Sequence, residues 1–168
     1  DRRGNLLRKE THRYPGNNYT ILEYENGLCI REDIYHEESG QLTERIETIY
    51  DRKGNPTKKV SLNPITGRIL ESWEYSYDRQ GRCIRETRYS KPEELIQYRE
   101  HVYDDAARTQ TSTLYRADGT VDGTRNIYTY DAYGNEILRE MIRDGEVYWR
   151  IRYLYEPADQ TQCERSFP

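Results

Sequence analysis

Histidine and cysteine are the residue types in this sequence best suited to ligate a metal or to act in acid-base chemistry, and both are scarce. The histidines are His12, His36 and His101, and the cysteines are Cys29, Cys83 and Cys163. No histidine stands at a short metal-ligand spacing from another histidine or from a cysteine along the chain. The sequence therefore predicts no metal site, no cofactor and no catalytic residue.

Neighbouring carboxylates are a second source of chemistry, and the sequence has several such pairs. They are Glu37 with Glu38, Glu93 with Glu94, and Asp104 with Asp105. Such pairs are common in solvated turns and do not by themselves identify a general acid or base. Asp104 and Asp105 could contribute to a Ca²⁺ site, but no further oxygen ligands follow at the spacing of a calcium loop. Because phosphate-binding loops and nucleophile elbows are also missing, the sequence favours a non-catalytic protein over an enzyme.

A tandem repeat runs through the sequence, and its fold must position these residues. Copies of Tyr-Asp-x-x-Gly recur about every 26 residues, and a second turn signal lies near the middle of each interval. The residues that define the repeat are Tyr50, Asp51, Gly54, Tyr77, Asp78, Gly81, Tyr103, Asp104, Tyr130, Asp131, Gly134 and Tyr155. The glycine tolerates a positive φ, and the aspartate accepts hydrogen bonds from backbone amides two or three residues on. The sequence thus predicts a turn about every 13 residues.

The segments between turns have the length and the period-two alternation of strands. Short connections make consecutive strands antiparallel neighbours. We therefore predict an all-β fold, an elongated and twisted antiparallel meander of about six hairpin repeats with roughly a dozen strands. The array spans residues 1–156, and residues 157–168 form a tail or cap. The best helical candidate is the segment 92–98, but its Glu93, Glu94 and Leu95 could equally form a turn that enters a strand.

Equivalent residues of neighbouring repeats form rows, or ladders, in such a sheet. One ladder holds the tyrosines that precede each aspartate, and a second ladder holds Tyr75, His101, Tyr128 and Tyr153. Since His101 replaces a tyrosine there, a packed or hydrogen-bonded imidazole is favoured over a catalytic one. Cys29 and Cys83 each begin a Cys-Ile-Arg-Glu segment two repeats apart, and that separation of roughly 19 Å is beyond disulfide reach. Both cysteines are predicted to be half-buried thiols.

The aromatic residues are the best candidates for a binding surface. Tyrosine and tryptophan rings on a sheet can stack on sugar rings or anchor a peptide. Trp73 and Trp149 stand out because other repeats carry Ile46, Arg99 or Asn126 at that place in the strand. The predicted binding residues are Trp73, Trp149, Tyr75, Tyr128 and Tyr153. The alternative that these rings pack as the core of the sheet stays open.

Composition limits the partners. The 168 residues are 34% hydrophobic and 33% charged, but the net charge is only −4 and 17 residues are tyrosine. Mixed charge and abundant tyrosine argue against disorder. An isoelectric point near 5.5 without a basic run disfavours nucleic acid, and the lack of a run of about 18 apolar residues predicts no membrane span. The chain begins at Asp1 without a visible signal peptide, so a mature product or an excised fragment is expected.

The repeat resembles the YD repeats of bacterial Rhs and wall-associated proteins, which also occur in teneurins and insecticidal toxin-complex shells. The similarity rests on Tyr-Asp-x-x-Gly-Asn followed by an aliphatic-rich strand that carries Arg-Glu, and it extends from Asp1 to about Tyr155. The resemblance implies an all-β fold and, in long arrays, a hollow shell around a toxin. With only about six units and no visible autoprotease segment or Rhs-associated core, an open strip is expected instead.

Two classes of function follow from these observations. The first is a non-catalytic, secreted or cell-surface interaction module that binds protein or carbohydrate through an aromatic sheet face or its edge strands. Self-association through sheet edges or array ends is a further expectation. The second is a fragment of a toxin-encapsulating shell, or a cognate protein associated with one.

Overall fold

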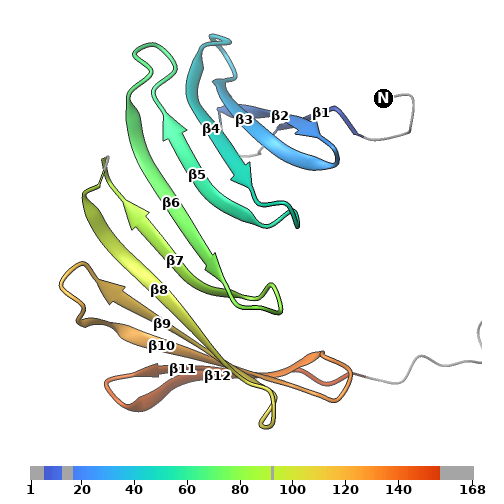
Figure 1. Cartoon of the computed structure of the whole chain (residues 1–168), viewed down its shortest axis with the longest axis vertical. Coiled ribbons are helices and arrows are strands. Elements are labelled where there is room, and N and C mark those ends of the chain that lie inside the picture. The colour runs from blue at the N-terminus through green and yellow to red at the C-terminus, as the bar shows by residue number, and fades with distance from the viewer. Residues whose placement is uncertain (1–5, 13–16, 92, 156–168) are drawn as a thin grey trace, which may run out of the picture. The chain divides into compact units, whose positions relative to one another are not determined.

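The regular structure of the chain is entirely β in the computed structural model, which describes residues 6–12, 17–91 and 93–155 (Figure 1). The strands are β1 (Arg8–His12), β2 (Asn18–Glu25), β3 (Leu28–His36), β4 (Leu42–Tyr50), β5 (Pro56–Leu62), β6 (Ile69–Tyr77), β7 (Cys83–Tyr89), β8 (Leu95–Asp104), β9 (Thr109–Arg116), β10 (Val121–Tyr130), β11 (Glu136–Arg143) and β12 (Glu146–Arg152). They are hydrogen-bonded in chain order in one open sheet. The predicted antiparallel meander of about a dozen strands is confirmed.

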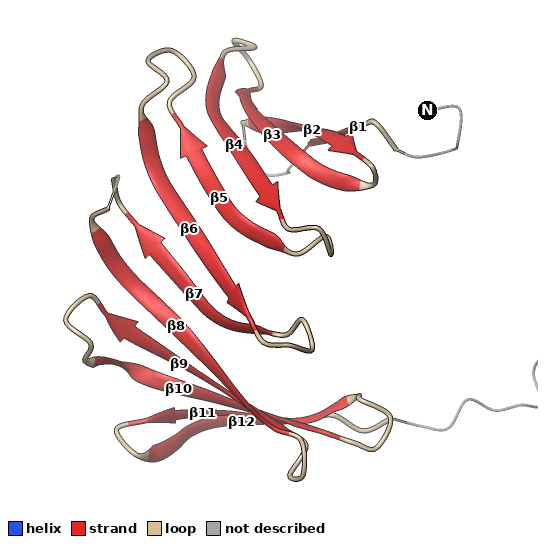
Figure 2. Cartoon of the chain, viewed as in Figure 1, coloured by secondary structure: helices blue, strands red, loops and turns tan. Residues whose placement is uncertain are grey.

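No helix occurs in the described part of the chain, as Figure 2 shows, and so none there is long and apolar enough to cross a membrane. The segment 93–98 is not helical: it forms the alternative, a turn that enters a strand, and Leu95 already begins β8. The amide of Ser90 donates a hydrogen bond to the carbonyl of Glu94 at 3.0 Å, which closes a turn before that strand. Local helix-forming residues are overridden here by the strand pairing that follows.

The chain divides into two compact units. The first comprises residues 1–101 and 113–122, and the second comprises residues 102–112 and 123–168. Strands β1 to β7 belong to the first unit, β11 and β12 belong to the second, and β8, β9 and β10 contribute residues to both. The predicted tail, residues 157–168, and Cys163 within it lie outside the described residues.

The aspartate of each Tyr-Asp turn closes that turn through its own carboxylate. Asp51 Oδ1 accepts hydrogen bonds from the backbone amides two and four residues on, at 2.8 and 2.9 Å. Asp78 and Asp131 repeat this pattern. The second hydrogen bond therefore comes from the amide four residues after the aspartate, whereas an amide two or three residues on was expected. Gly54 takes the predicted positive φ, 86°, where a side chain would be strained.

The turn at Asp104 departs from the motif, and a residue other than glycine takes the left-handed conformation there. At Asp104, where the repeat lacks its glycine, the amide of Ala107 donates to the carboxylate at 2.9 Å. Arg108 then takes the left-handed conformation, with a φ of 53°. Asp104 therefore acts as a turn former, in the role expected of the other repeat aspartates.

A β-bulge after the turns at Tyr50, Tyr77 and Tyr130 changes which side chains share a face. In the β6–β7 pair, Tyr77 lies opposite Cys83 and Tyr75 lies opposite Glu86, so Ile84 enters as an additional residue. Ile84 is 38% exposed. Alternate residues of β6 share a face, and so do their cross-strand partners. Cys83 and Glu86 therefore face the same way although they are three residues apart, which strict alternation would forbid.

Polar groups occupy the most buried positions of the sheet. Among the described residues these positions are held by Asp33, Ser61, Ser72, Ser112 and Thr113, and no large apolar side chain is fully buried. Asp33 is 4% exposed, and its carboxylate accepts two hydrogen bonds from the guanidinium of Arg45, at 2.7 and 3.0 Å. The buried charge is thus paired and hydrogen-bonded, as such groups must be.

The tyrosines that precede the turns connect neighbouring repeats. The Tyr50 hydroxyl donates to the carbonyl of Cys29, and the Tyr77 hydroxyl donates to the carbonyl of Pro56, both at 2.7 Å. In the second unit, the Tyr155 hydroxyl makes the corresponding bond to the carbonyl of Glu136 at 2.9 Å. Rings and long polar side chains thus cover the sheet where aliphatic residues are few.

Candidate functional site

One face of the first unit brings Trp73 together with several titratable side chains, and we name it the Trp73 face. Alternation along β6 places Trp73, Tyr75 and Tyr77 on it. Cross-strand pairing and alternation extend the face to Thr48 on β4, Lys59 on β5, Cys83, Glu86 and Arg88 on β7, and Gln97, Arg99 and His101 on β8.

A depression of about 210 Å³ lies beside Trp73. Its lining includes Trp73, Glu86, Arg88, Gln97, Arg99 and Leu114. The guanidinium carbon of Arg88 is 5.9 Å from the centroid of the Trp73 ring, within the range of a cation–π contact. The Glu71 carboxylate holds the same guanidinium through hydrogen bonds of 2.7 and 2.8 Å. The depression thus combines an aromatic wall with positioned hydrogen-bonding groups.

A second depression, of about 320 Å³, adjoins the first because Glu86 lines both. Its walls include the thiols of Cys29 and Cys83 and the rings of Tyr75 and Tyr77. Burial raises the pKa of Tyr77 to about 12, and neighbouring Cys83 adds to that rise. Burial also raises the pKa of Tyr75, so both phenols stay protonated at neutral pH. The Tyr77 proton is already donated to the carbonyl of Pro56, which leaves the Tyr75 hydroxyl as the phenol that can donate a hydrogen bond to a ligand.

An ion pair closes one side of the second depression. Lys59 Nζ lies 2.9 Å from Glu32 Oε1. Burial alone would lower the pKa of the Lys59 ammonium, but the hydrogen bond to Glu32 and its negative charge outweigh burial and leave that pKa raised. Lys59 is thus a fixed cation at this position.

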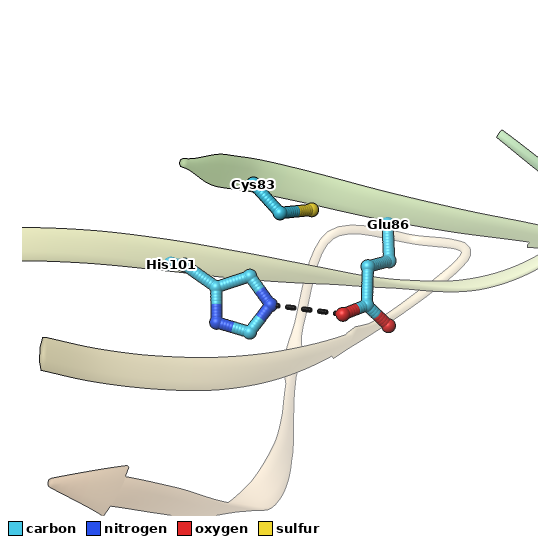
Figure 3. Close-up of side chains that lie close together, drawn as sticks. All are labelled: Cys83, Glu86 and His101. Carbon is cyan, nitrogen blue, oxygen red and sulfur yellow. Dashed lines mark hydrogen bonds and ion pairs between the residues drawn. The ribbon is translucent and has the colours of Figure 1, made fainter. Parts of the chain in front are cut away.

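Cys83, Glu86 and His101 converge near the second depression (Figure 3). The bulge of β7 directs Cys83 and Glu86 to the same face, and His101 follows Arg99, the direct partner of Glu86 on β8. One sulfur, one carboxylate oxygen and one imidazole nitrogen lie within 4.8 Å of one another. His101 Nε2 is 3.1 Å from Glu86 Oε1, and the His101 side chain is only 11% exposed.

In this cluster the pKa of the thiol and the pKa of the carboxylate shift in opposite directions. Burial raises the pKa of the Cys83 thiol, and the negative charge of Glu86 raises it further. The hydrogen bond from His101 lowers the pKa of Glu86, with help from the positive charge of Arg99. At neutral pH the cluster therefore holds a protonated thiol beside an ionised carboxylate, which makes Cys83 a poor nucleophile by itself.

The five predicted binding residues fall in both units, so the structure does not assign them to one site. Trp73 and Tyr75 line the two depressions of the first unit. In the second unit the Arg139 guanidinium carbon lies 5.1 Å from the centroid of the Tyr128 ring. Trp149 lies opposite Met141 in the β11–β12 pair, and Tyr153 lines a depression of about 500 Å³.

The Cys83, Glu86 and His101 cluster was missed by reasoning from the sequence. Spacing along the chain suggested no ligand set, and strict alternation would place Cys83 and Glu86 on opposite faces. The signal that could have revealed the cluster is the turn itself, because the bulges that follow the Tyr50 and Tyr77 turns shift the alternation by one residue. His101 was expected to be packed or hydrogen-bonded, and its bond to Glu86 confirms this.

No protein-family model and no curated protein matches the chain. Solved structures do match. The chain is similar, at 13% identity over 80% of its length and a TM-score of 0.43, to a chain in the structure of the Photorhabdus luminescens Tc holotoxin pore, of which it spans 8%. A protein of unknown function from Bacteroides fragilis matches at 12% identity and a TM-score of 0.38, over 83% of this chain and 94% of that one. A DUF3836 family protein from Bacteroides vulgatus matches at 14% identity and a TM-score of 0.26, over 76% and 99%.

Proposed function

We propose that the chain is a non-catalytic interaction module whose Trp73 face binds a glycan. The observation that carries the proposal is the depression beside Trp73, where an aromatic ring stands among Glu86, Arg88, Gln97 and Arg99. A sugar presents an apolar ring face together with hydroxyl groups that both donate and accept hydrogen bonds. An aromatic wall with charged and amide groups around it suits both features.

The hydrogen-bonding groups of this depression are held in place by the sheet. Arg88 is clamped by Glu71, and Glu86 is bound by His101. Groups that are fixed before the ligand arrives lose little conformational entropy on binding. This preorganisation supports a binding role for residues that lie on a strand pair and not on a loop.

We also propose that the array is a YD-repeat module of a secreted or surface protein. Support comes from the Tyr-Asp-x-x-Gly turns, which share a carboxylate bonding pattern at Asp51, Asp78 and Asp131. It comes equally from the ladder tyrosines, whose hydroxyls bond to backbone carbonyls of the preceding repeat. The repeat is thus defined by contacts and not by composition alone.

A glycan array probed with the full chain and with Trp73→Ala tests the binding proposal. We expect the chain to retain a defined set of glycans and Trp73→Ala to lose roughly tenfold or more in affinity, since aromatic anchors dominate such contacts. Tyr133→Ala is the matched control, because that ring is 90% exposed in a turn of the second unit.

Melting temperatures of the variants separate binding from folding. A large loss of affinity with an almost unchanged melting temperature for Trp73→Ala supports the proposal. The proposal is overturned if no glycan is retained, if Trp73→Ala binds like the unmodified chain, or if affinity falls only in proportion to unfolding. Retention of a protein partner alone would indicate a protein-binding face in its place.

A further inference from the structure

We propose that Cys83, Glu86 and His101 form a zinc-binding site on the Trp73 face. The three side chains present one thiol sulfur, one carboxylate oxygen and one imidazole nitrogen within 4.8 Å of one another. Thiolate, imidazole and carboxylate are the ligands that Zn²⁺ takes in proteins, and three protein ligands with an open fourth position are typical of sites that bind a further molecule. This inference does not depend on the glycan proposal.

One pair of ligand atoms already has about the separation found in a tetrahedral site. With zinc–ligand bonds of about 2.0–2.3 Å, ligand atoms lie roughly 3.3–3.6 Å apart. Glu86 Oε1 and His101 Nε2 are already 3.1 Å apart. The remaining adjustment falls on Cys83, whose thiol donates a long hydrogen bond of 3.6 Å to the carbonyl of Arg85. A rotation about one side-chain bond can supply such a movement.

Two strands fix the backbone that carries the ligands. Cys83 and Glu86 belong to β7, and His101 belongs to β8, which pairs with it. The β7 bulge is what gives Cys83 and Glu86 a common face. A site on paired strands holds its ligands more closely than a site on loops, so little ordering is required when the ion binds.

The charges around the cluster are compatible with a divalent cation. Glu86 carries a negative charge, and Cys83 would add a second when it loses its proton to the metal. Two positively charged side chains oppose the binding of Zn²⁺: Lys59 lines the same depression as Cys83 and Glu86, and Arg99 pairs with Glu86 across the strands. They reduce the attraction for Zn²⁺ but leave two anionic ligands in place.

The fourth ligand position can be reached from the second depression. Cys83 and Glu86 line that depression, together with the phenol of Tyr75. A water molecule or a donor atom of a bound molecule can therefore complete the coordination. The site would add a metal contact to a face whose other groups are rings, charged groups and amides.

Cobalt titration of the full chain tests the zinc site directly. Co²⁺ takes the place of Zn²⁺ and gives a near-ultraviolet charge-transfer band when a thiolate is bound. We use a Cys29→Ser, Cys163→Ser background, so that Cys83 is the only thiol, and add Zn²⁺ afterwards to displace the cobalt. The expected result is a thiolate band that saturates at about one cobalt per chain and disappears on addition of zinc.

Substitution of each proposed ligand in the same background shows which residues bind the cobalt and produce the thiolate band. Cys83→Ser should abolish it, and Glu86→Gln and His101→Tyr should each weaken cobalt binding roughly tenfold or more. His101→Tyr is the variant best suited to keep the fold, because other repeats carry tyrosine in this ladder, for example Tyr75. Gln97→Ala is the matched control outside the cluster and should bind cobalt like the parent.

The proposal is overturned if no thiolate band forms, if the band survives Cys83→Ser, or if His101→Tyr leaves cobalt affinity unchanged in a folded chain. Circular dichroism without metal establishes folding of each variant. If the variants do not fold, alkylation of the unmodified chain decides the matter. Zinc should then slow alkylation of Cys83 at least roughly tenfold and leave Cys29 unaffected, and equal rates at Cys83 with and without zinc contradict the site.

Discussion

Two hairpins of the first unit carry the same Cys-Ile-Arg-Glu segment and differ in what surrounds it. In both, the cysteine thiol donates to the carbonyl two residues on at 3.6 Å, and a bulge follows the cysteine. On the neighbouring strand, Thr48 stands beside Cys29 and Glu32 at the position that His101 occupies beside Cys83 and Glu86. The repeated backbone thus supplies the same platform twice, and one ladder residue decides whether an imidazole joins it.

The two carboxylates also have different partners. Glu32 pairs with the ammonium of Lys59 at 2.9 Å, whereas Glu86 pairs with the imidazole of His101 at 3.1 Å. A lysine ammonium donates hydrogen bonds but cannot ligate a metal while it is charged. We infer that Lys59 neutralises Glu32 in the first hairpin, and that His101 leaves Glu86 able to act as a ligand in the second.

The largest effect is expected from a double variant, called the graft, that changes the Cys29 hairpin to resemble the Cys83 hairpin. Thr48→His with Lys59→Ser gives Cys29 and Glu32 an imidazole and removes the competing cation. In a chain that carries Cys163→Ser, cobalt binding should rise from about one to about two equivalents, with a second thiolate ligand. Spectroscopic titration measures both quantities.

Thr48→His alone is the control for the graft, because Lys59 still holds Glu32. A second equivalent in the double variant but not in the single one supports the role given to Lys59. If the double variant binds no more cobalt than the parent chain, the comparison between the hairpins is wrong.

The ladder tyrosines should matter equally in neighbouring repeats. Tyr50→Phe and Tyr77→Phe each remove one hydroxyl that donates to a carbonyl at 2.7 Å. Each should lower the free energy of unfolding by about 0.5–1.5 kcal/mol, the usual contribution of such a bond. Urea denaturation measures the change, and a loss confined to one variant would show that the repeats are not equivalent in stability.

Alkaline pH should weaken the fold at Tyr77. Burial raises the pKa of this phenol from its usual value of 10.0 to about 12, so the folded chain holds its proton more tightly than the unfolded chain does. The contribution of Tyr77 to stability is therefore complete below pH 10 and is lost as the pH rises toward about 12. Ultraviolet titration of the chain and of Tyr77→Phe measures the phenolate, and a Tyr77 phenolate that forms near pH 10 contradicts the assignment.

The smallest effect is expected from Lys59→Met without the graft. The Lys59–Glu32 pair is about one-third exposed, and such pairs contribute roughly 0.2–1 kcal/mol. The methionine keeps the aliphatic stem that covers the sheet. Thermal denaturation should show a shift of a few degrees at most, and a larger loss would mean that Lys59 stabilises the depression by more than its charge.

Turn spacing was sufficient to predict the meander, because Asp51, Asp78 and Asp131 mark turns whose chemistry is local. Which side chains share a face of the sheet could be predicted only as far as each bulge. Ile84 illustrates the limit, since an additional residue in β7 reverses the alternation that follows and no single residue type announces it. The cluster around His101 depends on that reversal and on pairing between β7 and β8, and so could not be derived from spacing along one strand.

The most direct test of the central claim is X-ray absorption at the zinc edge on the unmodified chain loaded with about one equivalent of Zn²⁺. Cys83, Glu86 and His101 predict one sulfur neighbour at about 2.3 Å, with nitrogen and oxygen neighbours at about 2.0–2.2 Å and the outer-shell pattern of one imidazole. Two sulfur neighbours, or none, would show that the bulged strand does not bring this thiol, carboxylate and imidazole to one ion.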